Sequence, residues 1–124
     1  MWDALKTLLQ LHGEAVWCIL GDFNDVRSID ERRGQTDATD SVAYAPFNQF
    51  IDGNFLNDLP LCGRSFTWYR GDGIAMSRLD RFLLSNFWAF MFPNCIQVAL
   101  SRGLSDHCPI LLTIDKENWG PKPL

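Results

Sequence analysis

The sequence predicts a mixed α/β (α+β) fold in which a mostly antiparallel sheet is covered by helices on one face. Apolar residues recur at helical spacing near the amino terminus and again before Gly53. Short apolar runs bounded by turn residues follow from residue 55 onward, as in a sheet of short strands. With 124 residues, of which 47% are hydrophobic, the chain is long enough for one domain with a packed core.

Three helices are expected from the spacing of apolar residues and from stop signals. The first covers residues 2–12 and ends at Gly13, the second precedes Gly53, and the third covers residues 86–92 and ends at Pro93. The residues of the first helix that should face the core are Trp2, Leu5, Leu8 and Leu9. The second helix has an aromatic face that should also be buried, formed by Tyr44, Phe47, Phe50 and Ile51.

The strands alternate with turn signals. Residues 16–20 form a continuous apolar run, which predicts a buried strand that delivers polar residues at its carboxyl end. Residues 25–42 are polar, lack either period and predict a long surface loop. Gly71 and Gly73 lie in a hairpin signal at residues 70–73. The remaining strands are expected at residues 55–59, 65–69, 77–84, 95–100 and 109–114.

Composition and charge exclude several classes of protein. A net charge of −4 argues against a protein that binds nucleic acid by bulk electrostatic attraction. No apolar run approaches the roughly 18 residues that a membrane span needs, and no basic and then hydrophobic leader follows Met1. The four cysteines have no CxxC spacing, so reduced thiols are favoured over a zinc site. We therefore expect an intracellular protein that is not secreted.

Arginine outnumbers lysine eight to three, and several arginines lie near polar motifs. These are Arg27, Arg32, Arg33, Arg78, Arg81 and Arg102. A guanidinium group is suited to phosphate oxygens. The alternative is that these arginines form ion pairs with nearby acids such as Asp25, Asp30 and Glu31.

Three polar motifs carry the candidate chemistry. Asp22 and Asn24 follow the first strand, and in an extended backbone their side chains would project to the same side. Asp22 is then a candidate to orient or deprotonate a water molecule, and Asn24 to bind a phosphate oxygen. Asp106 and His107 precede the last strand, where a carboxylate is suited to Mg²⁺ or Mn²⁺ and an imidazole to proton transfer.

Asp80 interrupts an apolar strand and needs a partner if its side chain points inward. A histidine is a natural partner, because a carboxylate fixes the imidazole tautomer and raises its basicity. We therefore predict that Asp80 pairs with His107. The second histidine, His12, lies at the end of the first helix and is expected to be exposed or to cap that helix.

The motifs together resemble the endonuclease/exonuclease/phosphatase family, and in particular the endonuclease domains of plant long interspersed (non-LTR) retrotransposons. The matching segments, in order, are residues 21–24, 66–69, 77–85 and 104–110, with a similar loop at residues 25–34. The resemblance implies a four-layer α/β sandwich and phosphodiester hydrolysis with Mg²⁺ or Mn²⁺. It also implies nicking of DNA before target-primed reverse transcription, and so the nucleus as a compartment.

Carried over position by position, the resemblance assigns catalytic roles to Asp22, Asn24, Asp80 and His107 and a metal-binding role to Asp106. Trp68 and Arg78 occupy positions that line the family's site and would contact substrate. In the family, an amino-terminal half supplies a metal-binding glutamate and an asparagine. No equivalent precedes Gly21 in this sequence.

The chain therefore resembles the carboxyl half of the family's domain, in residues 1–117, followed by a linker or tail in residues 118–124. Half of a sandwich would expose apolar surface, so self-association or a complementing amino-terminal half is expected beside DNA as a partner. The metal would be weakly bound, because one ligand is missing. Two alternatives remain open at this point: a non-catalytic retroelement relic or interaction fragment, and a phosphatase or phospholipase of the same superfamily.

Overall fold

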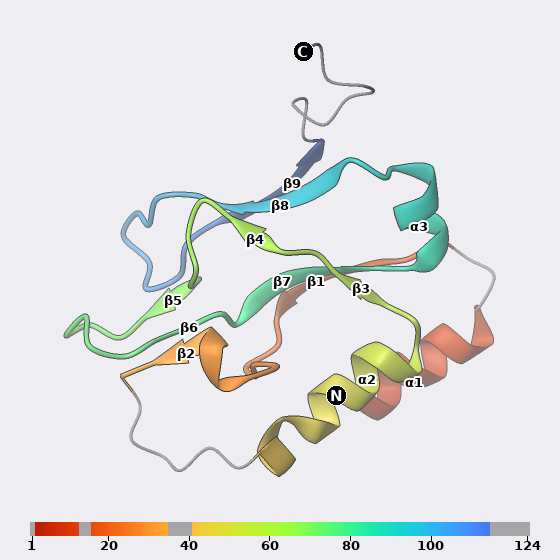
Figure 1. The fold of residues 1–124 in the computed structure, drawn as a ribbon, viewed down its shortest axis with the longest axis horizontal. Helices are drawn as coiled ribbons and strands as arrows, with labels where there is room; N and C mark the ends of the chain where they lie inside the picture. Colours follow the sequence, from red (N-terminus) through yellow and green to blue (C-terminus); the bar gives the residue numbers. More distant parts are fainter. Residues whose placement is uncertain (1, 13–15, 35–40, 115–124) are drawn as a thin grey trace.

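A computed structural model of the protein describes residues 2–12, 16–34 and 41–114 (Figure 1). Within these ranges, the helices are α1 (Trp2–Leu11), α2 (Ala45–Gly53) and α3 (Asn86–Met91). Two 3-10 turns, η1 (Ile29–Glu31) and η2 (Ser41–Tyr44), precede β2 and α2. None of the helices in the described part of the chain has both the length and the hydropathy of a membrane span.

The strands of these described ranges form three sheets of three strands each. The first sheet has the order β1-β7-β3, with β1 (Cys18–Asp22), β7 (Asp80–Leu84) and β3 (Asn57–Asp58). The second has the order β2-β6-β5, with β2 (Arg32–Arg33), β6 (Met76–Ser77) and β5 (Trp68–Tyr69). The third has the order β4-β8-β9, with β4 (Leu61–Cys62), β8 (Cys95–Ala99) and β9 (Ile110–Ile114).

The mixed α/β class and its largely antiparallel pairing are thus confirmed. The pair β4 and β8 is parallel, and the other strand pairs within the three sheets are antiparallel. The strands are shared among three sheets instead of one. Several of them are only two residues long, and a glycine or proline follows within two residues of the ends of β2, β3, β4 and β5.

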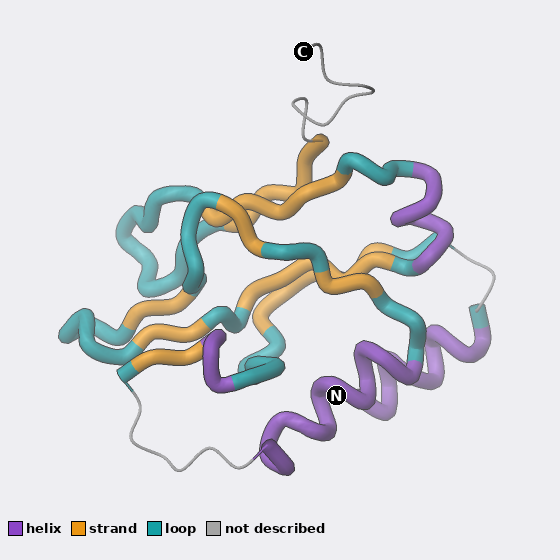
Figure 2. Tube along the Cα trace, in the orientation of Figure 1, coloured by secondary structure: helices purple, strands orange, loops and turns teal. Residues whose placement is uncertain are grey.

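Helices α1 and α2 lie side by side and cover one face of the first sheet (Figure 2). The buried side chains that form this core are Leu9, Phe23, Phe47, Phe50, Ile51, Leu56 and Leu83, with Leu5, Trp17 and Ile19 packed against them. The expectation that Leu8 faces the core is wrong, because its side chain is 46% exposed. The side chain of Trp2 lies outside the described part of the structure.

Strand β1 lies at an edge of the first sheet and is not the buried strand that its sequence predicts. Its side chains alternate in exposure, and Leu20 is 62% exposed. An edge strand packs on the core through one face only, and that face carries Ile19, with Phe23 following the strand. The loop predicted at residues 25–42 contains η1 and β2. Residues 35–40 of that loop and the tail predicted from residue 118 lie outside the described residues.

A network of buried charges joins η1 to the first sheet. Arg81, which is 0% exposed, lies within 2.7 Å of a carboxylate oxygen of both Glu31 and Asp58. Arg78 lies 3.2 Å from Glu31 and 3.1 Å from Asp58. Buried arginines keep their charge only when acids compensate for the lost hydration, so this network fixes η1, and β2 after it, against β7.

Candidate functional site

The candidate site lies where β1 ends and β7 begins. Asp22, the last residue of β1, is directly opposite Asp80, the first residue of β7. The backbone of His107 bridges to Trp68 of β5, which brings the segment before β9 to the same place. Side chains that are far apart in the sequence therefore meet at the boundary between the first and second sheets.

The imidazole of His107 lies between two carboxylates. Its Nδ1 is 2.7 Å from Oδ2 of Asp80, which confirms the predicted pair. Its Nε2 is 3.6 Å from Oδ2 of Asp22 and 4.0 Å from Oδ1 of Asp106. Because an ionised carboxylate only accepts hydrogen bonds, Asp80 holds the proton of His107 on Nδ1 and directs Nε2 toward Asp22.

The charge on His107 follows from these neighbours. Partial burial by itself would lower the pKa of the imidazole, since it disfavours the charged form. The hydrogen bond and negative charge of Asp80, together with the charges of Asp22 and Asp106, act in the opposite direction and raise the pKa of His107 above its ordinary value. The site therefore favours a protonated imidazole that is able to donate from both nitrogens.

Asn24 reaches the site by a turn and not by extension of β1. Its φ is 54°, in the left-handed region, and its backbone N–H donates to Oδ1 of Asp22 at 2.8 Å. The prediction that an extended backbone aligns the two side chains is therefore wrong. Asparagine tolerates this conformation better than most residues, and the turn leaves Oδ2 of Asp22 directed toward His107.

Asp22, Asn24 and His107 line an open cleft of about 300 Å³. The remaining residues of its wall are Arg32, Trp68, Ser77 and Leu79. The position of Trp68 agrees with the expectation that it lines the site. Its indole Nε1 donates to Oδ2 of Asp106 at 3.2 Å, and the neighbouring Tyr69 backbone N–H donates to the backbone oxygen of Asp106 at 3.0 Å.

Within the described residues, donor atoms of Asp22, Asp80 and His107 lie within 4.8 Å of one another and could hold a metal ion. Carboxylate oxygens of this kind are suited to Mg²⁺ or Mn²⁺. Asp106, which the resemblance assigns to the metal, lies beside this group with a largely exposed side chain, and one of its oxygens accepts from Trp68. The carboxylates of this group could hold a divalent cation, whereas His107 would be a ligand only in its neutral form.

Arg78 is a correction to the expected site. Its side chain is buried, lies in the ion network with Glu31 and Asp58, and donates to the backbone oxygen of Leu59 at 2.8 Å. It is absent from the wall of the cleft. The alternative, that this arginine pairs with nearby acids, describes it correctly, because desolvation makes a buried guanidinium seek carboxylates.

Two residues of the cleft wall have no assigned role in the sequence reasoning. From the sequence, Arg32 is only one of several arginines near the polar motifs. Ser77 is only a member of the matching segment at residues 77–85. They face each other because Arg32 of β2 pairs with Ser77 of β6. Strands of two residues leave no periodic signal, so the sequence offers no sign of this pairing.

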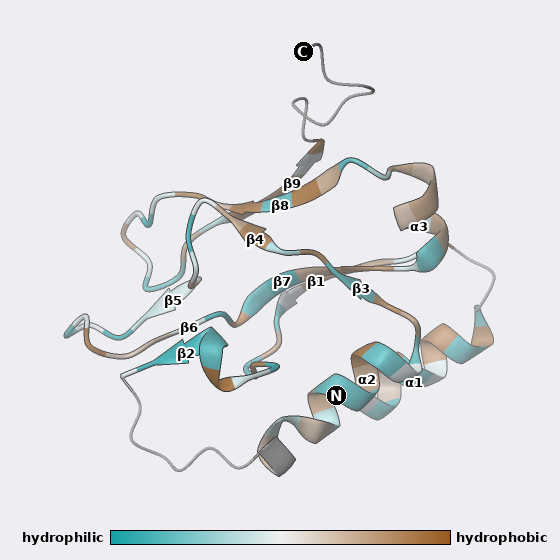
Figure 3. Ribbon diagram, in the orientation of Figure 1, coloured by the Kyte–Doolittle hydropathy of each residue, from teal (hydrophilic) through white to brown (hydrophobic). Residues whose placement is uncertain are grey.

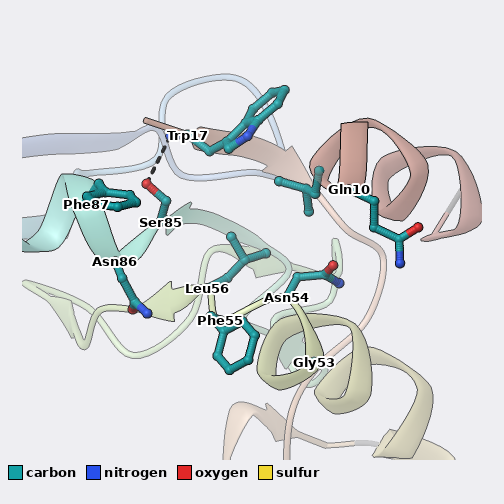
Figure 4. A pocket seen from close by; sticks show the side chains of 10 residues that line it. Gln10, Trp17, Gly53, Asn54, Phe55, Leu56, Ser85, Asn86 and Phe87 are labelled. Atoms are coloured by element: carbon teal, nitrogen blue, oxygen red, sulfur yellow. Dashed lines mark hydrogen bonds between the residues drawn. The ribbon is translucent and has the colours of Figure 1, made fainter. Parts of the chain in front are cut away.

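A second and larger hollow, of about 370 Å³, lies between α1, the end of α2 and the start of α3 (Figure 4). Its lining includes Trp17, Leu56, Ser85 and Phe87, and none of its lining residues is an acid, a base or a cysteine. The hydroxyl of Ser85 accepts from the backbone N–H of Trp17 at 3.0 Å. This hollow lacks the groups that acid-base or metal chemistry requires, so size alone does not make it the candidate site.

Comparison with known proteins adds no further assignment. No protein-family model matches the chain, and no curated protein matches it.

Proposed function

We propose that the protein is a metal-dependent phosphodiester hydrolase of the DNA endonuclease type. The observation that carries this proposal is the meeting of Asp22, Asp80 and His107, from three separate segments, beside an open cleft that Asp22 and His107 line. A carboxylate pair with an imidazole supplies both a metal site and a proton donor, which are the groups that hydrolysis without a covalent intermediate needs.

Each side chain has a role that its position supports. Asp22 carries an oxygen that is not used by the turn and is placed to orient a water molecule. The amide of Asn24, on the wall of the same cleft, is placed to donate to a phosphate oxygen. His107, with its pKa raised by Asp80, donates from Nε2 to a phosphate oxygen as negative charge develops there.

Asp22, with Asp80 or Asp106, would hold Mg²⁺ or Mn²⁺. When bound, such an ion neutralises charge on the phosphate and makes a water molecule more acidic. Trp68 supports a nucleic acid substrate, because an aromatic ring in the wall of a cleft can stack on a base. With a net charge of −4, the protein would bind DNA through this local site and not through a general attraction to the backbone.

The test is a nicking assay on supercoiled plasmid with Mg²⁺ or Mn²⁺, which measures conversion to the open circle. We expect the natural chain to nick, and Asp22→Ala and His107→Ala each to lower the rate by about 100-fold or more, since general acid-base groups contribute that much. The matched control is Asp72→Ala, which removes an exposed acid that pairs with Arg70 outside the cleft.

Nicking by Asp22→Ala at the rate of the natural chain would show that a contaminating nuclease or a different site is responsible. Failure of the natural chain to nick with either metal would contradict the endonuclease proposal and favour a non-catalytic role. Parallel assays on a phosphomonoester and on a phospholipid separate the phosphatase and phospholipase alternatives from DNA cleavage.

A further inference from the structure

A row of four residues crosses the second sheet and reaches the candidate site. Arg32 of β2 is opposite Ser77 of β6, Ser77 is opposite Trp68 of β5, and Trp68 bridges to His107. Residues that are directly opposite in neighbouring strands project from the same face of a sheet. All four therefore line one cleft, with His107 at one end of the row and Arg32 at the other.

Two buried polar atoms in this wall lack a hydrogen-bond partner. Ser77 is 1% exposed, and its Oγ is unpaired; Nε of Arg32 is also buried and unpaired. Leaving such groups without a partner destabilises a protein, so natural structures rarely do so without a functional reason. Here the two unpaired atoms belong to residues that face each other across β2 and β6.

The guanidinium of Arg32, a partly buried residue, differs from those of the two buried arginines. Arg78 and Arg81 also have an unpaired Nε, but their remaining nitrogens contact Glu31 and Asp58. Within the described residues, no acid lies within ion-pair distance of Arg32. Its guanidinium therefore has no ion-pair partner among the described residues, and it lies in the wall of a cleft that also carries the carboxylate of Asp22.

We propose that Arg32 and Ser77 form an anion subsite that binds a phosphate group of the substrate. A phosphate oxygen accepts from the guanidinium of Arg32 and from the hydroxyl of Ser77, which gives both groups the partner that they lack. Both atoms are covered in the structure, so the Arg32 side chain moves as the phosphate enters. The subsite deepens the proposed function, because it adds a charged contact at the end of the row opposite His107.

The positive charge of Arg32 would reduce the repulsion between an anionic substrate and the acids of the site. An anionic substrate approaching Asp22 meets a negative charge, and an arginine in the same wall offsets that repulsion before any metal is bound. Its planar group also fixes the orientation of a phosphate more strongly than a lysine would. The subsite would therefore contribute to substrate binding independently of the metal ion.

The test is a titration without metal, in which inorganic phosphate and, separately, the dinucleotide d(TpT) are added and the indole N–H resonance of Trp68 is followed by NMR. The natural chain should show saturable shifts. Arg32→Gln should weaken binding by about tenfold or more, the usual effect of losing a charge-assisted hydrogen bond. Tighter binding of d(TpT) than of phosphate would identify a phosphodiester as the ligand, and the reverse order a phosphomonoester.

Arg33→Gln is the matched control. Arg33 is the next residue of β2, projects to the opposite face and lies over the ring of Phe66. This variant should bind within about twofold of the natural chain, because an exposed charge contributes little to binding at a site that it does not touch. Ser77→Ala provides a second variant that keeps every charge, and it should weaken binding of both probes without changing the net charge.

Undiminished phosphate binding by folded Arg32→Gln, or an equal loss in Arg33→Gln, would overturn the subsite. If Arg32→Gln does not fold, unchanged binding by Ser77→Ala would overturn it instead. The outcomes for the two proposals are separate. If the protein nicks DNA but does not bind phosphate without metal, the hydrolase proposal stands and the subsite proposal is wrong. If it binds phosphate but does not nick DNA, the anion subsite stands and the hydrolase proposal is wrong.

Discussion

Asp80 sets the chemical state of His107 through one short contact. Its Oδ2 lies 2.7 Å from Nδ1 of His107, while Asp22 and Asp106 approach the other nitrogen from 3.6 and 4.0 Å. Interactions between charges weaken with distance and with exposure to solvent, so Asp80 has the strongest effect on the imidazole. The other two acids add to it without hydrogen-bonding to the ring.

We predict that Asp80→Asn lowers the pKa of His107, because the asparagine keeps the shape of the side chain and removes its charge. The pKa is measured by NMR from the imidazole resonances. His12, the other histidine of the chain, is the internal control, because it lies in another part of the structure at the end of α1. An unchanged pKa of His107 in this variant would show that Asp80 is not the group that raises it.

The same shift gives the sign of a pH effect on stability. Because the pKa of His107 is raised on folding, its contribution to the free energy of unfolding is fully present below its unfolded pKa, near about 6.5. That contribution is lost as the pH rises through the folded pKa. It should be smaller in Asp80→Asn, and urea denaturation at several pH values measures the difference.

The sequence predicts the Asp80–His107 pair for a reason that the structure bears out. An acid within an apolar strand has to find a partner, and the chain has only two histidines, one of them at the end of α1. The same reasoning does not locate Arg78, because the acids that bind it, Glu31 and Asp58, belong to segments whose positions the sequence does not fix. Arg32 and Ser77 are likewise not predicted as site residues, because they come together through the pairing of two very short strands.

Glu31 attaches the turn η1 to the first sheet through its side chain and through its backbone oxygen, which accepts from the backbone N–H of Arg78 at 2.8 Å. Glu31 accepts from Arg81 at 2.7 Å and from the backbone N–H of Arg27 at 2.7 Å, and it also contacts Arg78. Burial by itself would raise the pKa of this carboxyl, but the hydrogen bonds and charges of the arginines lower it below its ordinary value. The strand β2, which carries Arg32, follows directly after this anchor.

We predict that Glu31→Gln destabilises the protein by about 3 kcal/mol, since removing one partner of a buried ion pair leaves the other charge uncompensated. Chemical denaturation at neutral pH measures this loss. Asp30→Asn is the matched control, because Asp30 is the exposed neighbour in the same turn and its change should have an effect of less than about 0.5 kcal/mol. Equal effects of the two changes would contradict the anchoring role.

The pH dependence of this anchor has the opposite sign to that of His107. The pKa of Glu31 is lowered on folding, so its contribution is present above its unfolded pKa, near about 4.3, and is lost as the pH falls through the lower folded pKa. The difference in stability between the natural chain and Glu31→Gln should therefore shrink in acid. A difference that stays constant down to that range would contradict the ionised state assigned to Glu31.

The strand expected at residues 77–84 shows that a hydrophobic pattern does not reveal where a strand is interrupted. The structure divides it into β6 and β7, which belong to different sheets. The break occurs where Oγ1 of buried Thr67 accepts from the backbone N–H groups of Leu79 and Asp80, each at 3.0 Å. This contact comes from a distant segment, so the hydrophobic pattern of residues 77–84 gives no sign of it.

The three sheets together leave apolar side chains at the surface. Helix α3, coloured toward the hydrophobic end of the scale in Figure 3, exposes Phe87, Phe90 and Met91. Strand β9 is at the edge of the third sheet and exposes Leu111 and Ile114. Exposed apolar side chains on an edge strand and on a helix favour association with another chain.

We predict that the protein self-associates as its concentration rises, and that Phe90→Ser weakens this association by about tenfold through the loss of apolar area. Phe90 is 85% exposed, so the change should have little effect on folding. Sedimentation velocity measures the association. Leu104→Ser is the control, because it removes a fully exposed apolar side chain from the segment before the candidate site. A protein that stays monomeric at every concentration would contradict self-association and favour a different chain as the partner of this surface.

Asp80 and Arg81 are adjacent in the sequence, but their side chains lie on opposite faces of β7. Asp80 contacts His107, whereas Arg81 is buried between Glu31 and Asp58. This division depends on the alternation of side chains along β7. A shift of β7 by one residue against β1 and β3 would exchange the two faces, placing a cation against the imidazole and an acid in the interior. Natural variants and engineered libraries of this protein should therefore tolerate substitutions here far better than changes in length.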